Sequence, residues 1–162
     1  MGVRQRRMQA NYLEVGTLPA FVLMGAGFTE LNESPSAQTT SKRYINDKSA
    51  TQSITGYEWS TAFTTDQIKE QEVVEYICNI GEKQLTGTEA ETRYVMVSLD
   101  KLAAEATPNV FEARMINVAV EISDFGDEDG EMTAEGNLLG NGDIVPGTFS
   151  TETKTFTATV VV

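Results

Sequence analysis

Residues 34–63 read SPSAQTTSKRYINDKSATQSITGYEWSTAF, and the two halves of this stretch differ in character. The first half, Ser34–Ser53, is polar and contains few large apolar side chains. The second half, Ile54–Phe63, alternates aromatic with small or polar residues, which is typical of a β-strand with one buried face. An alternating aromatic such as Trp59 is more typical of a core than of a ligand platform. The stretch therefore predicts a long polar loop joined to a core strand.

The predicted loop covers about residues 33–53, a length that is unusual in a compact domain. Structureless connections beyond ~12–15 residues are commonly functional or disordered. Its middle also holds some of the few basic side chains of an acidic chain. We expect the loop either to be solvated or to dock on the acidic surface of another copy, which would order it. The predicted contact residues are Lys42, Arg43, Tyr44, Ile45, Asn46, Asp47 and Lys48.

Composition indicates one globular domain over residues 1–162, with 40% hydrophobic residues. There are 12 basic and 24 acidic side chains and no histidine, which gives a formal charge of −12. Such a surface repels nucleic acid phosphates, so tight DNA binding is disfavoured, although a polyanion could slide past. The single cysteine cannot form an intrachain disulfide, which fits synthesis in a reducing cytoplasm. No apolar run reaches the ~18 residues of a membrane helix, so no membrane anchor is expected.

The remaining pattern predicts a mainly β domain. A helix is expected from Thr64, which opens a capping box with Gln67, to Gly81 as its C-terminal cap. Residues 1–12 are expected to form a flexible arm. An apolar run over Ala20–Met24, broken by Gly25 and Gly27 before Phe28–Asn32, predicts two strands or one bulged strand. Alternation of apolar and polar residues predicts strands in Arg93–Leu99, Met115–Ile122, Glu131–Leu138 and Thr153–Val160. Seven or eight strands with one flanking α-helix indicate an antiparallel β-sandwich or barrel.

An acidic turn is the only candidate for a metal site. Asp124, Asp127 and Asp129 lie on a Gly-rich hairpin tip, which could be simply solvated or could hold an adventitious cation. The EF-hand spacing is not met. Because there is no histidine, a histidine-based triad and a Cys/His zinc site are both excluded. With no nucleotide-binding motif either, we expect no enzyme and no cofactor.

Several segments resemble a known family. The most specific is YINDKS, Tyr44–Ser49, leading into SITGYE, Ser53–Glu58; TRYVMVSLD from residue 92 and GTFSTETKTFTA from residue 147 match as pattern. Across about residues 10–160 the chain resembles the tail tube, or major tail, proteins of long-tailed bacteriophages and prophages of Gram-positive bacteria. The Arg-rich start, residues 2–8, is not part of this resemblance.

The resemblance implies a β-sandwich or barrel with one flanking helix that forms hexameric rings, stacked into a tube. The implied partners are further copies of the chain, the tape measure protein, the tail terminator and the distal tail protein. DNA would pass through the lumen without specific binding. The implied location is the virion, after synthesis in the host cytoplasm. The long loop would reach neighbouring subunits, and no catalytic residue is implied.

Two other functions fit parts of the sequence. A β-sandwich adhesion or carbohydrate-binding module would use Trp59 and Tyr57 to stack on sugars and would be a stable monomer. A calcium-dependent structural domain would lose thermal stability when a chelator removes the ion.

Overall fold

The computed structural model describes residues 2–16, 20–103 and 108–159. In these residues the chain is mainly β, with eleven strands, one α-helix and two short 3-10 helices. The strands are β1 Gln9–Val15, β2 Ala20–Leu23, β3 Phe28–Ser34, β4 Ala37–Lys42, β5 Thr51–Tyr57, β6 Ser60–Asp66, β7 Glu91–Leu102, β8 Val110–Glu128, β9 Glu131–Gly140, β10 Val145–Ser150 and β11 Thr155–Ala158. The helices are η1 Arg6–Met8, α1 Glu72–Lys83 and η2 Gly87–Ala90.

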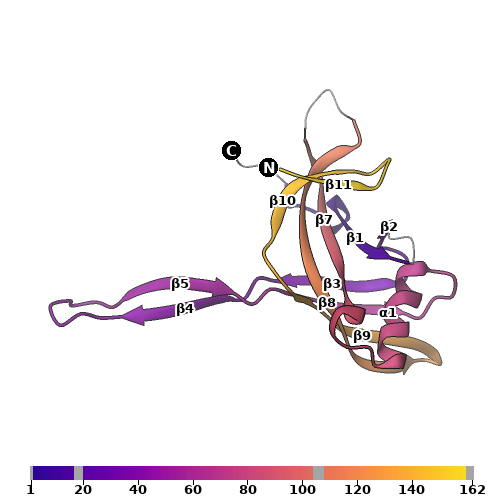
Figure 1. The fold of residues 1–162 in the computed structure, drawn as a ribbon, viewed down its shortest axis with the longest axis horizontal. Coiled ribbons are helices and arrows are strands. Elements are labelled where there is room, and N and C mark those ends of the chain that lie inside the picture. Colours follow the sequence, from indigo (N-terminus) through magenta and orange to yellow (C-terminus); the bar gives the residue numbers. More distant parts are fainter. Residues whose placement is uncertain (1, 17–19, 104–107, 160–162) are drawn as a thin grey trace.

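Nine of the strands form one antiparallel sheet in the order β2-β1-β7-β8-β9-β6-β3, with β10 and β11 attached at β8. The 19-residue strand β8 has two partners on one edge: Val110–Met115 pair with β10, and residues from Val118 onward pair with β9. The strands β4 and β5 form a separate two-stranded sheet, which projects from the body of the molecule (Figure 1). These observations confirm the predicted antiparallel β fold with one helix.

Strand β7 carries core residues on both of its faces. Tyr94 and Met96 pack with α1 and the inner residues of β8, while Val95 and Val97 pack with Phe149 of β10 in a second cluster. The four β7 side chains are 0–2% exposed. Since successive side chains of a strand point to opposite faces, β7 holds two hydrophobic layers together.

Helix α1 begins at Glu72, so the predicted start at Thr64 is wrong. Residues Thr64 and Thr65 belong to β6, where Thr65 pairs with Ala134 of β9, and this ladder overrides the local capping pattern. The sequence pattern predicts an apolar stripe on this helix of Val73, Val74, Ile77 and Cys78 and, more weakly, Ile68 and Ile80. All of these except Ile68 are buried on α1, whereas Ile68 precedes the helix and is 39% exposed.

The C-terminal end of α1 also differs from the prediction. Gly81 lies inside the helix, where a β-carbon would come within 2.8 Å of Ile122 and Phe125 side chains. The helix instead ends at Lys83, and the next residue, Gln84, caps it in a left-handed conformation with φ 52°. Close packing on β8, rather than chain reversal, explains this glycine.

The N-terminal segment is more ordered than predicted. Residues 9–12 of the expected flexible arm belong to β1, which pairs with both β2 and β7, and Tyr12 is buried. Upstream, Arg4 donates hydrogen bonds to Ser98 (3.0 Å) and to Asp100 (3.1 and 3.2 Å) on β7.

Three other strand predictions are confirmed within longer elements: β7, β8 and β9 contain the predicted stretches and extend beyond them. The last strand is shorter than predicted, since β11 ends at Ala158, and the predicted end at Val160 lies outside the described residues.

Candidate functional site

The predicted loop over about residues 33–53 is not structureless. Most of it forms a β-hairpin with the residues that follow, β4 (Ala37–Lys42) paired with β5 (Thr51–Tyr57). We call residues 37–57 the arm; it points away from the body along most of its length (Figure 1). Its strands are rich in threonine, which is favoured in β-strands, although their polarity suggested a loop.

The predicted core strand over residues 54–63 is likewise divided. Tyr57 ends β5 and is 63% exposed, whereas Trp59 is 7% exposed and precedes β6. Trp59 is therefore a core residue, as predicted, but Tyr57 belongs to the arm.

A β-bulge makes the arm amphipathic. Tyr57 pairs with Ala37 and Ile54 pairs with Thr39, with a register shift between these pairs. Because paired residues share a face, Tyr57 and Ile54 lie on the same side of the arm, although they are three positions apart on β5. We call this side the apolar face; Ile54 is 59% exposed there.

The opposite face of the arm is polar. There Thr40 and Ser53 are a cross-strand pair whose hydroxyl oxygens lie 3.2 Å apart. The two faces therefore differ in chemistry while both are open to solvent within the described structure.

The predicted contact residues gather at the tip of the arm. Lys42 ends β4, and the residues from Arg43 to Lys48 form the start of the connection to β5. The Asp47 amide donates to the Tyr44 carbonyl (3.0 Å), and the Tyr44 amide donates to the Asp47 carboxylate (3.2 Å), which closes a turn. Tyr44 and Ile45 are fully open, at 65% and 101% exposure. Their role in subunit contact stays a prediction.

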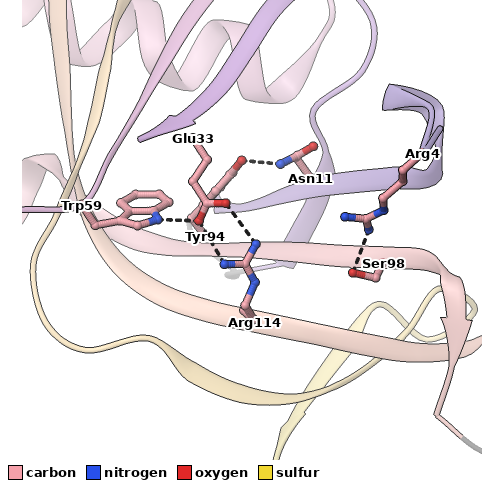
Figure 2. Close-up of polar contacts among 7 residues, drawn as sticks. All are labelled: Arg4, Asn11, Glu33, Trp59, Tyr94, Ser98 and Arg114. Atoms are coloured by element: carbon pink, nitrogen blue, oxygen red, sulfur yellow. Dashed lines mark hydrogen bonds and ion pairs between the residues drawn. The ribbon is translucent and has the colours of Figure 1, made fainter. Parts of the chain in front are cut away.

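The root of the arm is anchored to the body by a charged cluster (Figure 2). Glu33 of β3 accepts a hydrogen bond of 2.6 Å from the indole nitrogen of Trp59. The two terminal nitrogens of Arg114 on β8 each donate to one oxygen of Glu33, both at 3.1 Å. A bidentate, charge-assisted pair of this kind fixes orientation as well as position. Because Glu33 precedes the arm and Trp59 follows it, the cluster holds both ends of the arm.

Sequence reasoning missed Glu33 and Arg114 as an anchor. They are 81 residues apart, and no local pattern links them. Only the buried Trp59, which needs an acceptor for its N–H, gave a signal that a polar partner must exist nearby.

Beneath the anchor lies a second polar contact (Figure 2). The Asn11 side-chain amide donates to the hydroxyl of Tyr94, and Arg6 donates to the Asn11 oxygen at 2.7 Å. Burial raises the pKa of Tyr94 far above its ordinary value, and the Asn11 hydrogen bond opposes this only in part. Tyr94 therefore stays neutral and acts as a packed core residue.

A cleft of about 800 Å³ opens at the root, between the arm and the body. We call it the root cleft. Tyr57, Leu139 and Ile144 contribute exposed apolar surface to it, and Glu58 and Asp143 contribute carboxylates. Glu58 and Asp143 take part in none of the three ion pairs found within the described residues.

One part of the main sheet, made of three neighbouring strands, carries no basic residue. Strands β9, β6 and β3 are neighbours and contain neither lysine nor arginine. Their outward side chains, together with those of β8, form what we call the polar face: Glu30, Asn32, Ser34, Ser60, Ala62, Thr64, Ala119, Glu121, Glu135, Asn137 and Leu139. Hydrogen bonds from Thr64 to Glu30 and from Asn137 to Glu121, both 3.2 Å, run across this face.

The residues of the acidic hairpin tip are not gathered into a metal-ligand group, and a cation at this tip stays a prediction. Asp124 and Asp127 lie on β8 and Asp129 lies in the turn that follows. In the part of the chain that the structure describes, no group of three or more His, Cys, Asp or Glu side chains is arranged to hold a metal ion. The same described residues include no helix that is both long and apolar enough to cross a membrane.

Comparisons with known proteins relate this chain to others at the level of structure. No protein-family model matches the sequence, and no curated protein matches it. A chain from the tail of an empty GTA particle, solved by helical refinement with C6 symmetry, superposes with a TM-score of 0.61 and 14% identity. The match covers 96% of this chain and 100% of that chain. The protein therefore shares its fold, a mainly β antiparallel domain with one helix, with a chain of the tail of that GTA particle.

Proposed function

We propose that this protein is a non-enzymatic structural subunit that assembles with copies of itself into stacked six-membered rings, forming the tube of a phage or phage-like tail. The observation that carries the proposal is the arm, which leaves Ile54, Tyr57 and its tip exposed. An isolated two-stranded hairpin is at best marginally stable in water, so such an arm needs a partner surface. The shared fold with a tail protein of C6 symmetry supports copies of the same chain as that partner.

The energetics favour a closed assembly over a simple pair. Burying each exposed apolar side chain contributes about 1.5–3 kcal/mol, so four such side chains on the arm contribute roughly 6–12 kcal/mol before losses. Association itself costs an estimated 4–15 kcal/mol in lost freedom. The net free energy of a single arm contact is thus close to zero. A ring or tube, in which every copy makes several contacts, is stable.

The polar face is the surface best suited to line a tube that DNA crosses. It offers acidic and neutral polar side chains and no cation that would bind phosphate. We propose that it faces the lumen, so that DNA transits without specific binding. The segments at Tyr44–Ser49 and Ser53–Glu58 favour a long-tailed phage or prophage of Gram-positive bacteria, with the virion as location. The tape measure, tail terminator and distal tail proteins are the further partners proposed on that basis.

The carbohydrate-binding alternative loses one of its two aromatic residues. Trp59 is buried and its indole N–H is engaged by Glu33, which leaves Tyr57 alone to stack on a sugar. Only Tyr57 of the two is exposed.

Microscopy tests the proposal most directly. Purified protein at rising concentration should give rings or hollow tubes in negative stain, and a monomer at every concentration would contradict the proposal. A variant in which a short Gly-Ser link replaces residues 37–57 should stay folded and monomeric. The link can close because the Glu58 amide already donates to the Ser36 carbonyl at 3.0 Å.

A matched pair of substitutions separates the arm's two faces. Ile54→Asp with Tyr57→Asp places charge on the apolar face and should block assembly. Gln38→Asp with Ser53→Asp places the same charge on the polar side of the arm, at positions that are not directly opposite each other, and should be tolerated. Equal effects from both pairs would show that the apolar face is not the contact.

A further inference from the structure

We propose that the tip of one copy's arm inserts into the root cleft of a neighbouring copy, with Tyr44 and Ile45 entering and Arg43 and Lys48 pairing with the carboxylates of the rim. This inference rests on the proposed self-assembly and names the receiving site for the arm.

The geometry requires a second copy as the source of the tip. From Ser36 to Tyr44 the chain runs out along β4, a distance of roughly 27 Å at about 3.4 Å per residue. The root cleft lies at the other end of the same arm, lined by Ser36 and Tyr57. A straight hairpin cannot return its tip to its own root, as the extended arm in Figure 1 makes clear.

The apolar parts of the two surfaces are matched. The cleft presents Tyr57, Leu139 and Ile144 over a floor that includes the buried Trp59. The tip presents two adjacent apolar side chains, Tyr44 and Ile45, with the latter completely exposed. Clefts of about 300–1,000 Å³ accommodate groups of this size, and the volume here falls in that range.

The charges are also complementary. Within residues 42–48 there are three basic side chains and one acidic side chain, so the tip is cationic. At the cleft, Arg114 is paired with Glu33, which leaves Glu58 and Asp143 as its unpaired charges. Opposite charges at a rim guide association and select the partner.

The other basic segment of the chain is less suited to the cleft. Arg4 already pairs with Asp100, and Arg6 donates to the Gln9 carbonyl and to Asn11. The arm tip, by contrast, makes only the turn contacts between Tyr44 and Asp47 among the described residues.

Tip and cleft are different surfaces, so the contact is heterologous. Every copy offers one tip and one cleft, and a heterologous contact generates either a closed ring or an open helical array. Both outcomes fit stacked rings, since an arm of this reach can cross to a neighbour in the same ring or in the next.

Disulfide trapping tests the contact by position. In a Cys78→Ala background, which removes the single native cysteine, Ile45→Cys and Ile144→Cys are placed in separate proteins and mixed under assembling conditions. Mild oxidation should give a mixed dimer of the two proteins in preference to either self-dimer. Met132→Cys, at an exposed apolar position on β9, is the matched control and should not react with Ile45→Cys. A Val3→Cys protein that captures Ile144→Cys in its place would show that the N-terminal segment fills the cleft and would overturn the inference.

Charge reversal tests the rim. Glu58→Lys with Asp143→Lys, and separately Arg43→Glu with Lys48→Glu, should each raise the assembly midpoint concentration roughly tenfold. An equimolar mixture or the fourfold variant should assemble near the wild-type midpoint. Assembly of the wild type without trapping and without charge rescue would overturn the tip-to-cleft contact and leave the proposed function intact. Failure of the wild type to assemble at all would overturn both.

Discussion

Removal of the Glu33 carboxylate should lower the stability of the folded protein. It should also leave the arm less firmly oriented. Glu33→Ala deletes three hydrogen bonds, one from Trp59 and two from Arg114. It leaves the indole N–H of the buried Trp59 without an acceptor, which costs about 1–3 kcal/mol. Arg114 is 42% exposed, so water replaces much of its lost pairing and adds at most about 1 kcal/mol. The expected loss is therefore about 1–4 kcal/mol.

Equilibrium unfolding in urea measures this loss, with Trp59 as the single tryptophan and a direct fluorescent reporter of the anchor. For a chain of 162 residues the same change corresponds to roughly 2–16 °C in Tm. Glu30→Ala is the matched control, because Glu30 lies on the same strand but on the solvent side, and it should cost less than about 0.5 kcal/mol. Glu33→Gln, which keeps an acceptor for Trp59, should fall between the two.

The result that would refute this reasoning is a Glu33→Ala variant as stable as Glu30→Ala. The anchor would then be a surface contact with no energetic role. A variant that is destabilised as expected but assembles like the wild type would show that the anchor supports the fold without orienting the arm.

Three further outcomes follow from close packing and burial. Gly136→Ala should prevent folding, seen as lost β circular dichroism, because a β-carbon would lie 1.9 Å from the Glu121 carbonyl oxygen; Gly56→Ala, with no atom within 4 Å, should fold normally. Phe149→Ala removes a ring that is 0% exposed and should cost about 3–5 kcal/mol in urea unfolding. The raised pKa of Tyr94 keeps the folded state protonated above pH ~10, where the unfolded chain ionises. The contribution of protonated Tyr94 to stability should therefore be fully present below that pH and be lost as the pH rises above it. Tyr94→Phe should reduce this loss of stability.

The local alternation of the chain was sufficient to predict much of the body. Tyr94 to Val97 alternates between two apolar sets, and the structure uses both sets as core. The helix stripe was predicted correctly from Val73 to Ile80, but Ile68 and the helix start were not. The pairing of Thr65 with Ala134 is a long-range contact that outweighs a capping pattern.

The candidate site was harder to predict. The tip residues were located together because they are adjacent in sequence. The hairpin that presents them was missed because threonine-rich polar strands and polar loops have similar compositions. Cross-strand pairing, such as that of Thr39 with Ile54, identifies the segment as two strands. The anchor depends on the approach of Glu33 to Arg114, which is set by the topology of the whole sheet.

The face pattern that the bulge sets up in the arm limits the changes in length that the arm can accept. A single added residue per strand would turn every side chain beyond it to the opposite side, so the tip would face the wrong way. Two added residues per strand would restore the orientation and advance the tip by about 7 Å. Homologous arms that keep the same docking side are thus expected to differ in increments of two residues per strand. The spacing between subunits would then vary in discrete steps of about 7 Å.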